Sequence, residues 1–288
     1  MWLLWPIGGV TLAVIALALR RRADRRADTR EAARLRAASP RRPAAFALSM
    51  VSDLPEPAQR YFRFSIAPGT VLHTVAELHM QGRFSLGQKD DPKYMEMTAR
   101  QILAPLEGFV WAADMRMGAI PLSGSDSGGW TRFWLAGVVP VARQGGNPDH
   151  ARSAFGRQVA EAAFWCPAAL LPSPVVTWAA VDETTARVTL RRGDLEQAVD
   201  ITVDVDGRPT RVVLQRWSDA NPARVFRLQP FGGDLSEFRE VQGFRLATHV
   251  EAGNLYGTRD YFPFFIVDVV SVRFGAEREP GGETHPPP

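Results

Sequence analysis

The sequence has little cysteine and only a small excess of positive over negative charge. Cys166 is the single cysteine among 288 residues, and one thiol cannot close an internal disulfide. The formal net charge is only +3, and much of the basic excess lies in one segment near the N-terminus. The hydrophobic share of 45% is that of an ordinary globular protein, and the length is ample for a real core.

Two common catalytic motifs are also missing. SGSDSGGW, residues 123–130, is rich in glycine and serine but lacks the lysine of a phosphate-binding loop. G-x-S-x-G, which marks the nucleophile of many hydrolases, does not occur. These absences count against a nucleotide enzyme and against that hydrolase class. We expect the segment 123–130 to be a mobile turn at the rim of a sheet.

The N-terminal segment has no charged side chain from Met1 to Leu19. A helix of that length spans roughly 28 Å, close to the thickness of a bilayer core. Eight arginines follow between Arg20 and Arg36. A cleaved signal peptide has its basic residues before the apolar run, so this order predicts an uncleaved transmembrane helix over 1–19. A buried core helix is the alternative.

The position of the arginines predicts the side of the membrane. Arginines favour the cytoplasmic side, so we expect a single-pass protein of the inner (cytoplasmic) membrane with its folded part in the cytoplasm. Residues 20–48 are predicted as a basic juxtamembrane helix and linker. A solvated helix that contacts lipid is favoured over an arm that binds nucleic acid, and the bilayer is the expected partner.

Residues 49–275 show the pattern of one β-rich domain. Asp206-Gly207 joins two alternating segments as a hairpin turn, and similar segments recur from residue 71 onward. Apolar residues at helical spacing between Asn147 and Cys166 predict one helix, which Pro167 ends. A short helix is expected near Pro55 and Pro57. Residues 276–288, rich in glycine and proline, are predicted to be disordered.

These signals predict an α+β, mainly β, fold. About ten strands in sequential hairpins indicate a large antiparallel sheet, and a sheet of that size curls. The helical segment is the available plug for the curl, which gives a half-barrel. No repeat and no second domain are evident.

Aromatic residues predict what lies inside the curl. Three of them directly follow the glycine-rich segment, where aromatics often line the mouth of a ligand site, although ordinary core packing is the alternative. The candidate ligand-binding residues are Trp111, Trp130, Phe133, Trp134, Phe155, Glu161 and Trp165. Glu161 is a charge near the apolar stripe of the predicted helix; if it is buried, its carboxylate needs a partner such as Arg132 or Arg216.

Other constellations favour plain structural roles. His73, Glu77 and His79 share a strand face, and Glu77 and His79 could chelate a metal, but His73 is too far along the strand to join them, so a metal would need ligands from elsewhere and a solvated strand face is favoured. Ser153 and His150 crowd the start of the predicted helix, where Asp149 is best explained as the N-cap.

Cys166 before Pro167 is expected to be buried and inert. We therefore predict no catalytic residue, no metal and no cofactor.

Several segments resemble a known family. SDLPEPAQRYFRF, GFVWAADMRM, FGRQVAEAAFWCPAALLP and FREVQGFRLATHVEAG, with SGSDSGGW, resemble a bacterial family of unknown function that often follows an N-terminal membrane anchor. The likeness covers about residues 50–275 and implies fold and anchor only. The hairpins of the C-terminal half also resemble the half-barrel of periplasmic lipoprotein carriers. Those carriers act outside the cytoplasm, whereas the arginines indicate the cytoplasmic side.

The sequence thus favours a membrane-anchored protein that binds an apolar or amphipathic, lipid-like ligand. Two alternatives stay open. In the first, the aromatics pack on one another and the domain is a structural or partner-binding module. In the second, Glu161 or His150 serves a hydrolase.

Overall fold

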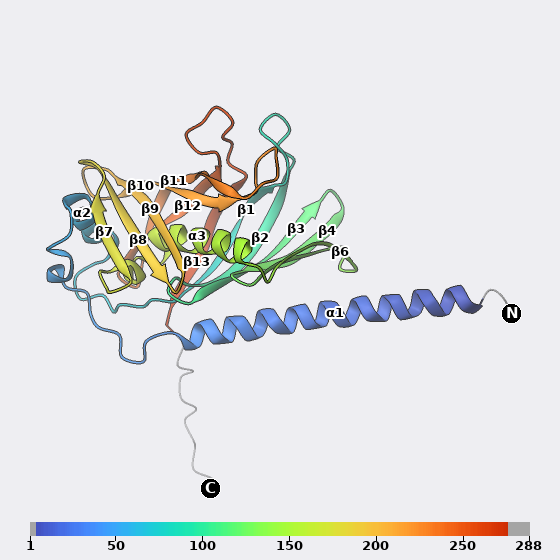
Figure 1. Cartoon of the computed structure of the whole chain (residues 1–288). Helices are drawn as coiled ribbons and strands as arrows, with labels where there is room; N and C mark the ends of the chain where they lie inside the picture. Colours follow the sequence, from blue (N-terminus) through green and yellow to red (C-terminus); the bar gives the residue numbers. More distant parts are fainter. Residues whose placement is uncertain (1–3, 276–288) are drawn as a thin grey trace, which may run out of the picture.

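One curved antiparallel sheet dominates the computed structural model, which describes residues 4–275 (Figure 1). It has thirteen strands within those residues. The strands are β1 (Ala76–Ser85), β2 (Tyr94–Ala104), β3 (Gly108–Met117), β4 (Ile120–Ser127), β5 (Trp130–Leu135), β6 (Val139–Gly145), β7 (Val176–Ala180), β8 (Thr185–Arg192), β9 (Leu195–Val203), β10 (Pro209–Ser218), β11 (Arg227–Val241), β12 (Phe244–Asn254) and β13 (Phe265–Phe274). The helices are α1 (Leu4–Ala37), α2 (Glu56–Ser65) and α3 (Pro148–Trp165), with short 3-10 helices η1 (Leu48–Val51) and η2 (Pro167–Leu170).

The strand order explains why a helix fills the curl. It runs β6-β5-β4-β3-β2-β1-β13-β12-β11-β10-β9-β8-β7, so the two edges of the sheet, β6 and β7, are consecutive strands in the sequence. The chain must cross from one edge to the other, and α3 with η2 makes that crossing on the concave side (Figure 1). The curved antiparallel sheet with its helical plug is therefore confirmed.

The prediction of about ten strands was too low. The glycine- and serine-rich segment is not a mobile turn but strand β4, and only Gly128 and Gly129 turn the chain into β5. A Cβ at Gly124 would lie 2.0 Å from the carbonyl oxygen of Arg132, so glycine lets β4 and β5 approach each other. In the other half, Arg227–Val241 form the single long strand β11 of 15 residues.

Helix α3 begins as the sequence suggested, with one correction. Asn147, not Asp149, is the N-cap, and its side chain accepts a hydrogen bond from the backbone nitrogen of His150. The Asp149 carboxylate instead accepts a hydrogen bond of 2.8 Å from Trp217 Nε1. At the other end, the fully buried Trp165 donates from Nε1 to the carbonyl of Ala247 on β12. These contacts fix both ends of α3 to the concave face.

Helix α2 covers the β7 end of the sheet. Pro55 is its N-cap and Pro57 lies in its first turn, as expected from the sequence. Tyr61 and Phe62 are completely buried, and the Tyr61 hydroxyl donates to the carbonyl of Ala163 on α3. The helix therefore joins the plug to the sheet.

Helix α1 is one continuous helix, and its C-terminal half packs on the outer face of the sheet (Figure 1). Leu35 is fully buried among Val75, Ile102 and Val110. This contact corrects the expectation of a solvated juxtamembrane helix, because the alternating strands β2 and β3 present apolar side chains on their outer face as well. Within residues 4–275, no helix combines the length and the hydropathy needed to cross a bilayer.

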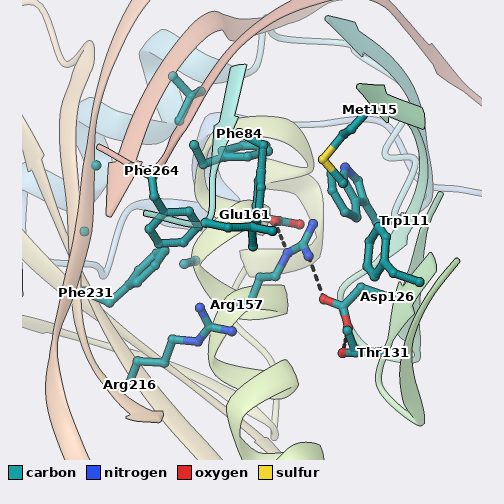
Figure 2. Close-up of a pocket in the computed structure, with 18 of the residues that line it drawn as sticks. Phe84, Trp111, Met115, Asp126, Thr131, Arg157, Glu161, Arg216, Phe231 and Phe264 are labelled. Atoms are coloured by element: carbon teal, nitrogen blue, oxygen red, sulfur yellow. Dashed lines mark hydrogen bonds and ion pairs between the residues drawn. The ribbon is translucent and has the colours of Figure 1, made fainter. Parts of the chain in front are cut away.

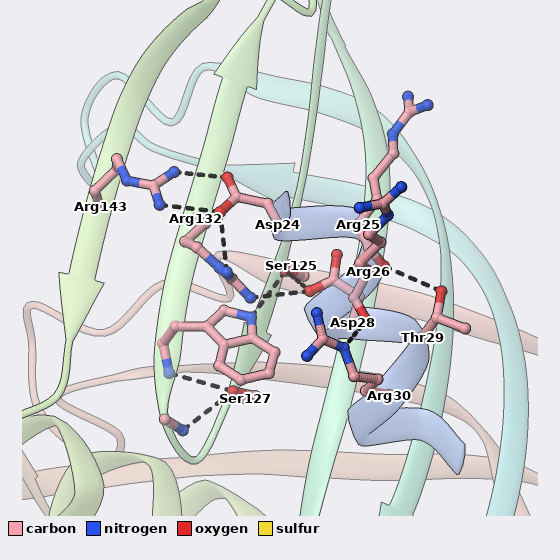
Figure 3. A network of polar contacts seen from close by, with 12 residues as sticks. Asp24, Arg25, Arg26, Asp28, Thr29, Arg30, Ser125, Ser127, Arg132 and Arg143 are labelled. Carbon is pink, nitrogen blue, oxygen red and sulfur yellow. Dashed lines mark hydrogen bonds and ion pairs between the residues drawn. The ribbon is translucent and has the colours of Figure 1, made fainter. Parts of the chain in front are cut away.

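A second attachment of α1 is polar (Figure 3). The Asp24 carboxylate receives hydrogen bonds from Arg132 Nη1 at 3.0 Å, Arg143 Nη1 at 2.7 Å and Trp134 Nε1 at 2.9 Å. One turn later, Asp28 accepts from Arg132 Nη2 at 3.2 Å. Two carboxylates of α1 thus hold the outer faces of β5 and β6.

Residues 1–3 and 276–288, with part of the predicted transmembrane segment and the predicted disordered tail, lie outside the described residues.

Candidate functional site

A cavity of about 530 Å³ lies between the concave face of the sheet and α3 (Figure 2). Strands from both halves of the sheet contribute to its wall, which is predominantly apolar. The lining includes Phe84, Leu86, Trp111, Met115, Met117, Leu122, Phe133, Leu135, Val141, Ala160, Phe164, Trp165, Val212, Leu214, Phe231, Leu235, Val250, Phe264 and Phe265. Ligand pockets in proteins measure roughly 300–1,000 Å³ and have this apolar character.

Aromatic rings form much of the wall. The ring centroids of Phe84 and Phe264 are 5.6 Å apart with their planes near perpendicular, and Phe231 lies 6.1 Å from Phe264. The ring of Trp111 lies 6.2 Å from that of Phe84 and 6.3 Å from that of Phe133. These contacts hold the rings in place while their remaining faces are left toward the cavity.

A buried polar cluster lies at one end of the cavity. Arg157 on α3 donates to Glu161 Oε1 at 2.6 Å and to Asp126 Oδ2 at 2.8 Å. Thr131 donates to the other oxygen of Asp126 at 2.6 Å, and Gln101 donates to the other oxygen of Glu161. Both carboxylates therefore have a partner on each oxygen. Burial alone would lower the pKa of Arg157, but the charges of Glu161 and Asp126 outweigh it and raise that pKa.

Arg216 on β10 reaches into the same cavity from the other side (Figure 2). Its Nε donates to the carbonyl of Ser153 at 3.2 Å, and its guanidinium lies 4.9 Å from the centre of the Phe231 ring. Burial, and then the charge of Arg157, lower the pKa of Arg216 to about 10. The group remains a cation at neutral pH.

The sequence named Arg132 or Arg216 as the partner of Glu161, and this was wrong. Arg132 lies on the outer face with Asp24, and the partner of Glu161 is Arg157, one helical turn earlier on α3. Positions i and i+4 are neighbours on a helix surface, so the spacing itself held the information.

The structure brings four of the seven predicted ligand-binding residues to the cavity, and they are Trp111, Phe133, Glu161 and Trp165. Trp130 and Trp134 lie on the outer face of β5, because side chains two apart on a strand share a face and Phe133 has the opposite one. Trp130 stacks on Arg132 at 4.0 Å. Phe155 is buried in the core beside Arg192 rather than in the cavity wall.

Sequence reasoning missed several lining residues. Phe84, Met115, Phe231 and Phe264 come from four separate segments, and only the curl of the sheet brings them together. Met115 had a usable signal, because it lies on the same strand as Trp111 at an even offset. Asp126 was hidden inside the segment that was predicted as a turn.

His150 has a polar environment of limited catalytic use. Its Nε2 lies 3.1 Å from Thr131 Oγ1, and its Nδ1 is buried with no hydrogen-bond partner in the described part of the chain. Ser153 contacts Arg216 through its backbone carbonyl. Among residues 4–275 no hydrogen bond joins Ser153 to His150, so this serine and this histidine are not arranged as a nucleophile and its base.

The remaining candidate side chains are possible metal ligands and the single thiol. No group of three or more potential ligand residues within the described segment could hold a metal ion. Glu77 forms an ion pair of 2.7 Å with Arg36 of α1. Burial raises the pKa of the Cys166 thiol to about 12, so it remains protonated, as the sequence suggested.

Comparisons with known proteins agree with the predicted family. No curated protein matches the chain. Two crystal structures match over most of their length. A LolA superfamily protein from Nitrosomonas europaea has 10% identity and a TM-score of 0.38, covering 81% of this chain and 96% of that one. A putative outer membrane lipoprotein-sorting protein domain from Vibrio parahaemolyticus has 11% identity and a TM-score of 0.37, covering 80% and 94%. Residues 44–266 match the model of a family of unknown function, DUF6544, and the chain belongs to that family.

Proposed function

We propose that the protein binds an apolar or amphipathic, lipid-like molecule inside the curved sheet. The observation that carries the proposal is the cavity of about 530 Å³ with its mainly apolar wall. Aromatics that only packed on one another, as in a purely structural module, would leave no such space, because protein interiors are close-packed. A volume of this size that is enclosed by a sheet and a helix is suited to a ligand.

The affinity would come mainly from apolar contact. Each buried methylene contributes about 0.8 kcal/mol, so affinity for straight-chain ligands should rise with chain length until the cavity is full. Neither a metal nor a cofactor is needed for such binding.

A cavity-filling variant tests this function. Ala160 lies on α3 and lines the cavity, so Ala160→Phe places a ring in the space that the ligand would occupy. The probe is N-phenyl-1-naphthylamine, an uncharged dye whose fluorescence rises in apolar surroundings. Ala179→Phe, at an exposed position of β7, is the matched control. We expect the wild type and the control to bind the dye and Ala160→Phe to lose at least tenfold in affinity.

Two results would count against the proposal. Absence of dye binding by the wild type would favour the structural module. Equal binding by the wild type and Ala160→Phe would place the dye elsewhere. Ala142→Phe, at another cavity position, checks that a loss reflects filling rather than misfolding.

We further propose that the N-terminal segment anchors the protein in the inner membrane, with the sheet domain on the cytoplasmic side. Exposed apolar side chains on α1, such as Leu12, Ile15 and Leu19, support this attachment. The turn between β5 and β6 lies beside this part of α1, and its Val138, which is 53% exposed, adds another apolar side chain to the same region. An alkaline phosphatase fused to the C-terminus should be inactive. An active fusion would place the domain on the other side of the membrane.

A further inference from the structure

Arg216 differs from the other charged side chains of the cavity because its two terminal nitrogens have no hydrogen-bond partner in the described part of the chain. Its Nε is used by the carbonyl of Ser153. Within residues 4–275, neither terminal nitrogen of its guanidinium has a protein acceptor at hydrogen-bond distance, and Figure 2 shows the group directed into the cavity. These two nitrogens carry four N–H donors.

The nearby carboxylates do not neutralise Arg216 by direct contact. Asp126 and Glu161 are the acidic side chains of the cavity lining, and both are ion-paired with Arg157. Each of their oxygens already accepts a hydrogen bond. Arg216 therefore faces the mainly apolar cavity without an ion-pair partner among residues 4–275.

A purely apolar cargo would not explain this residue. Val212, Leu214 and Arg216 share one face of β10, and all three line the cavity. A leucine or methionine at 216 would extend the apolar wall, whereas a half-buried cation without a counter-ion in contact is costly. The guanidinium fork matches the geometry of a carboxylate or a phosphate and binds either through two parallel hydrogen bonds.

We propose that Arg216 binds the anionic head group of an amphipathic ligand, a carboxylate or a phosphate, whose apolar chain lies along the aromatic wall of the cavity. This inference rests on the proposed function and narrows the ligand class to anionic amphiphiles. In this proposal the head group lies between Arg216 and the polar cluster around Arg157. The apolar chain extends toward Phe84, Trp111 and Phe264 (Figure 2).

Displacement of N-phenyl-1-naphthylamine from the full chain tests the inference. The competitors are laurate, dodecyl phosphate, dodecanol and dodecylammonium, which share one apolar chain and differ in the head group. The variant is Arg216→Met, which keeps most of the side-chain volume and removes the charge. Arg227→Met is the matched control, because Arg227 is an exposed arginine on the neighbouring strand β11.

For the wild type and Arg227→Met, we expect laurate or dodecyl phosphate to bind at least tenfold more tightly than dodecanol, and dodecylammonium to bind most weakly. Hydrogen bonds to a charged group support a preference of this size. Arg216→Met should lose that preference while its affinity for dodecanol stays within about twofold. Unchanged dodecanol binding also shows that the variant is folded, and Arg216→Gln serves as a second variant. The ratio of laurate to dodecyl phosphate affinity identifies the head group.

The inference is overturned if the anions and dodecanol compete equally in the wild type, or if Arg216→Met keeps the preference for anions. In both cases the apolar cavity still binds its ligand, and the proposed function stands. If the dye does not bind and no competitor changes its signal, the proposed function itself fails.

Discussion

Asp24 is expected to hold the middle of α1 on the outer face of the sheet, and its replacement by asparagine should release that part of the helix. The side chain keeps its shape in Asp24→Asn but loses its charge. Arg132 and Arg143, whose side chains are 12% and 27% exposed, then lose the carboxylate that they share. Breaking a buried ion pair by removing one partner costs about 3–5 kcal/mol.

The expected cost here is lower. Arg132 keeps its contact with Asp28, Arg143 reaches water in part, and Trp134 keeps an oxygen acceptor. A local cost of about 2–4 kcal/mol therefore follows, which corresponds to roughly 30-fold to several hundredfold in an opening equilibrium. Leu35 should stay buried, because its apolar contacts do not involve Asp24.

Hydrogen exchange of the full chain measures this change. Backbone amides of residues 21–30 should exchange faster in Asp24→Asn by that factor, and amides near Leu35 should change little. Arg26→Asn, at an exposed position of the same helix, is the control for helix propensity. If the amides of residues 21–30 exchange at the same rate in Asp24→Asn and in Arg26→Asn, the ion pairs do not hold α1 and the reasoning fails.

Three further predictions concern stability and reactivity. Burial alone would lower the pKa of His249, but hydrogen bonds to Asp268 and Glu251 raise it. The stabilisation is therefore full below the unfolded pKa of about 6.5 and is lost as pH rises through the folded value, so His249→Gln should lower Tm at pH 5.5 and change it little at pH 8.5. Phe62→Ala should reduce the free energy of unfolding by about 3–5 kcal/mol in urea denaturation, because Phe62 is fully buried between α2 and the sheet; a loss below 1 kcal/mol would contradict that packing. Cys166 should react with iodoacetamide only at the rate of global opening, whereas rapid labelling of the native protein would show that the thiol is accessible.

The sequence predicted the fold where its local rules agree with the tertiary structure. Val199, Ile201 and Val203 alternate on β9 and are all buried, and Asp206-Gly207 forms the turn to β10 as expected. Helix α3 begins in the predicted segment, although Asn147 rather than Asp149 is its cap, and Pro167 follows its end as predicted. Such signals depend only on residues close together in the sequence, so they can be recognised without knowing which distant segments pack against them.

The outer face of the sheet could not be predicted in the same way. Trp130 and Trp134 looked like parts of a ligand mouth because both are large aromatics beside glycines. Only the docking of α1 shows that Trp134 donates a hydrogen bond to Asp24 and that Trp130 stacks on Arg132 instead. A strand that is covered on both faces carries no alternation that would indicate which face holds the site.

Helix α3 explains why Arg157, the partner of Glu161 at the polar end of the cavity, escaped detection. In an ordinary amphipathic helix, Arg157 and Glu161 would be assigned to the solvent side, because both lie off the apolar stripe of Phe155, Val159 and Ala162. Nearly all residues from Ala154 to Trp165 are buried, since the curled sheet surrounds the helix on more than one side. A helix that crosses the inside of a half-barrel has a core face and a cavity face. The charged residues inside the buried stretch of such a helix, here Arg157 and Glu161, are therefore those that meet the cavity, and they should be the first candidates for binding in any sheet that curls around a single helix.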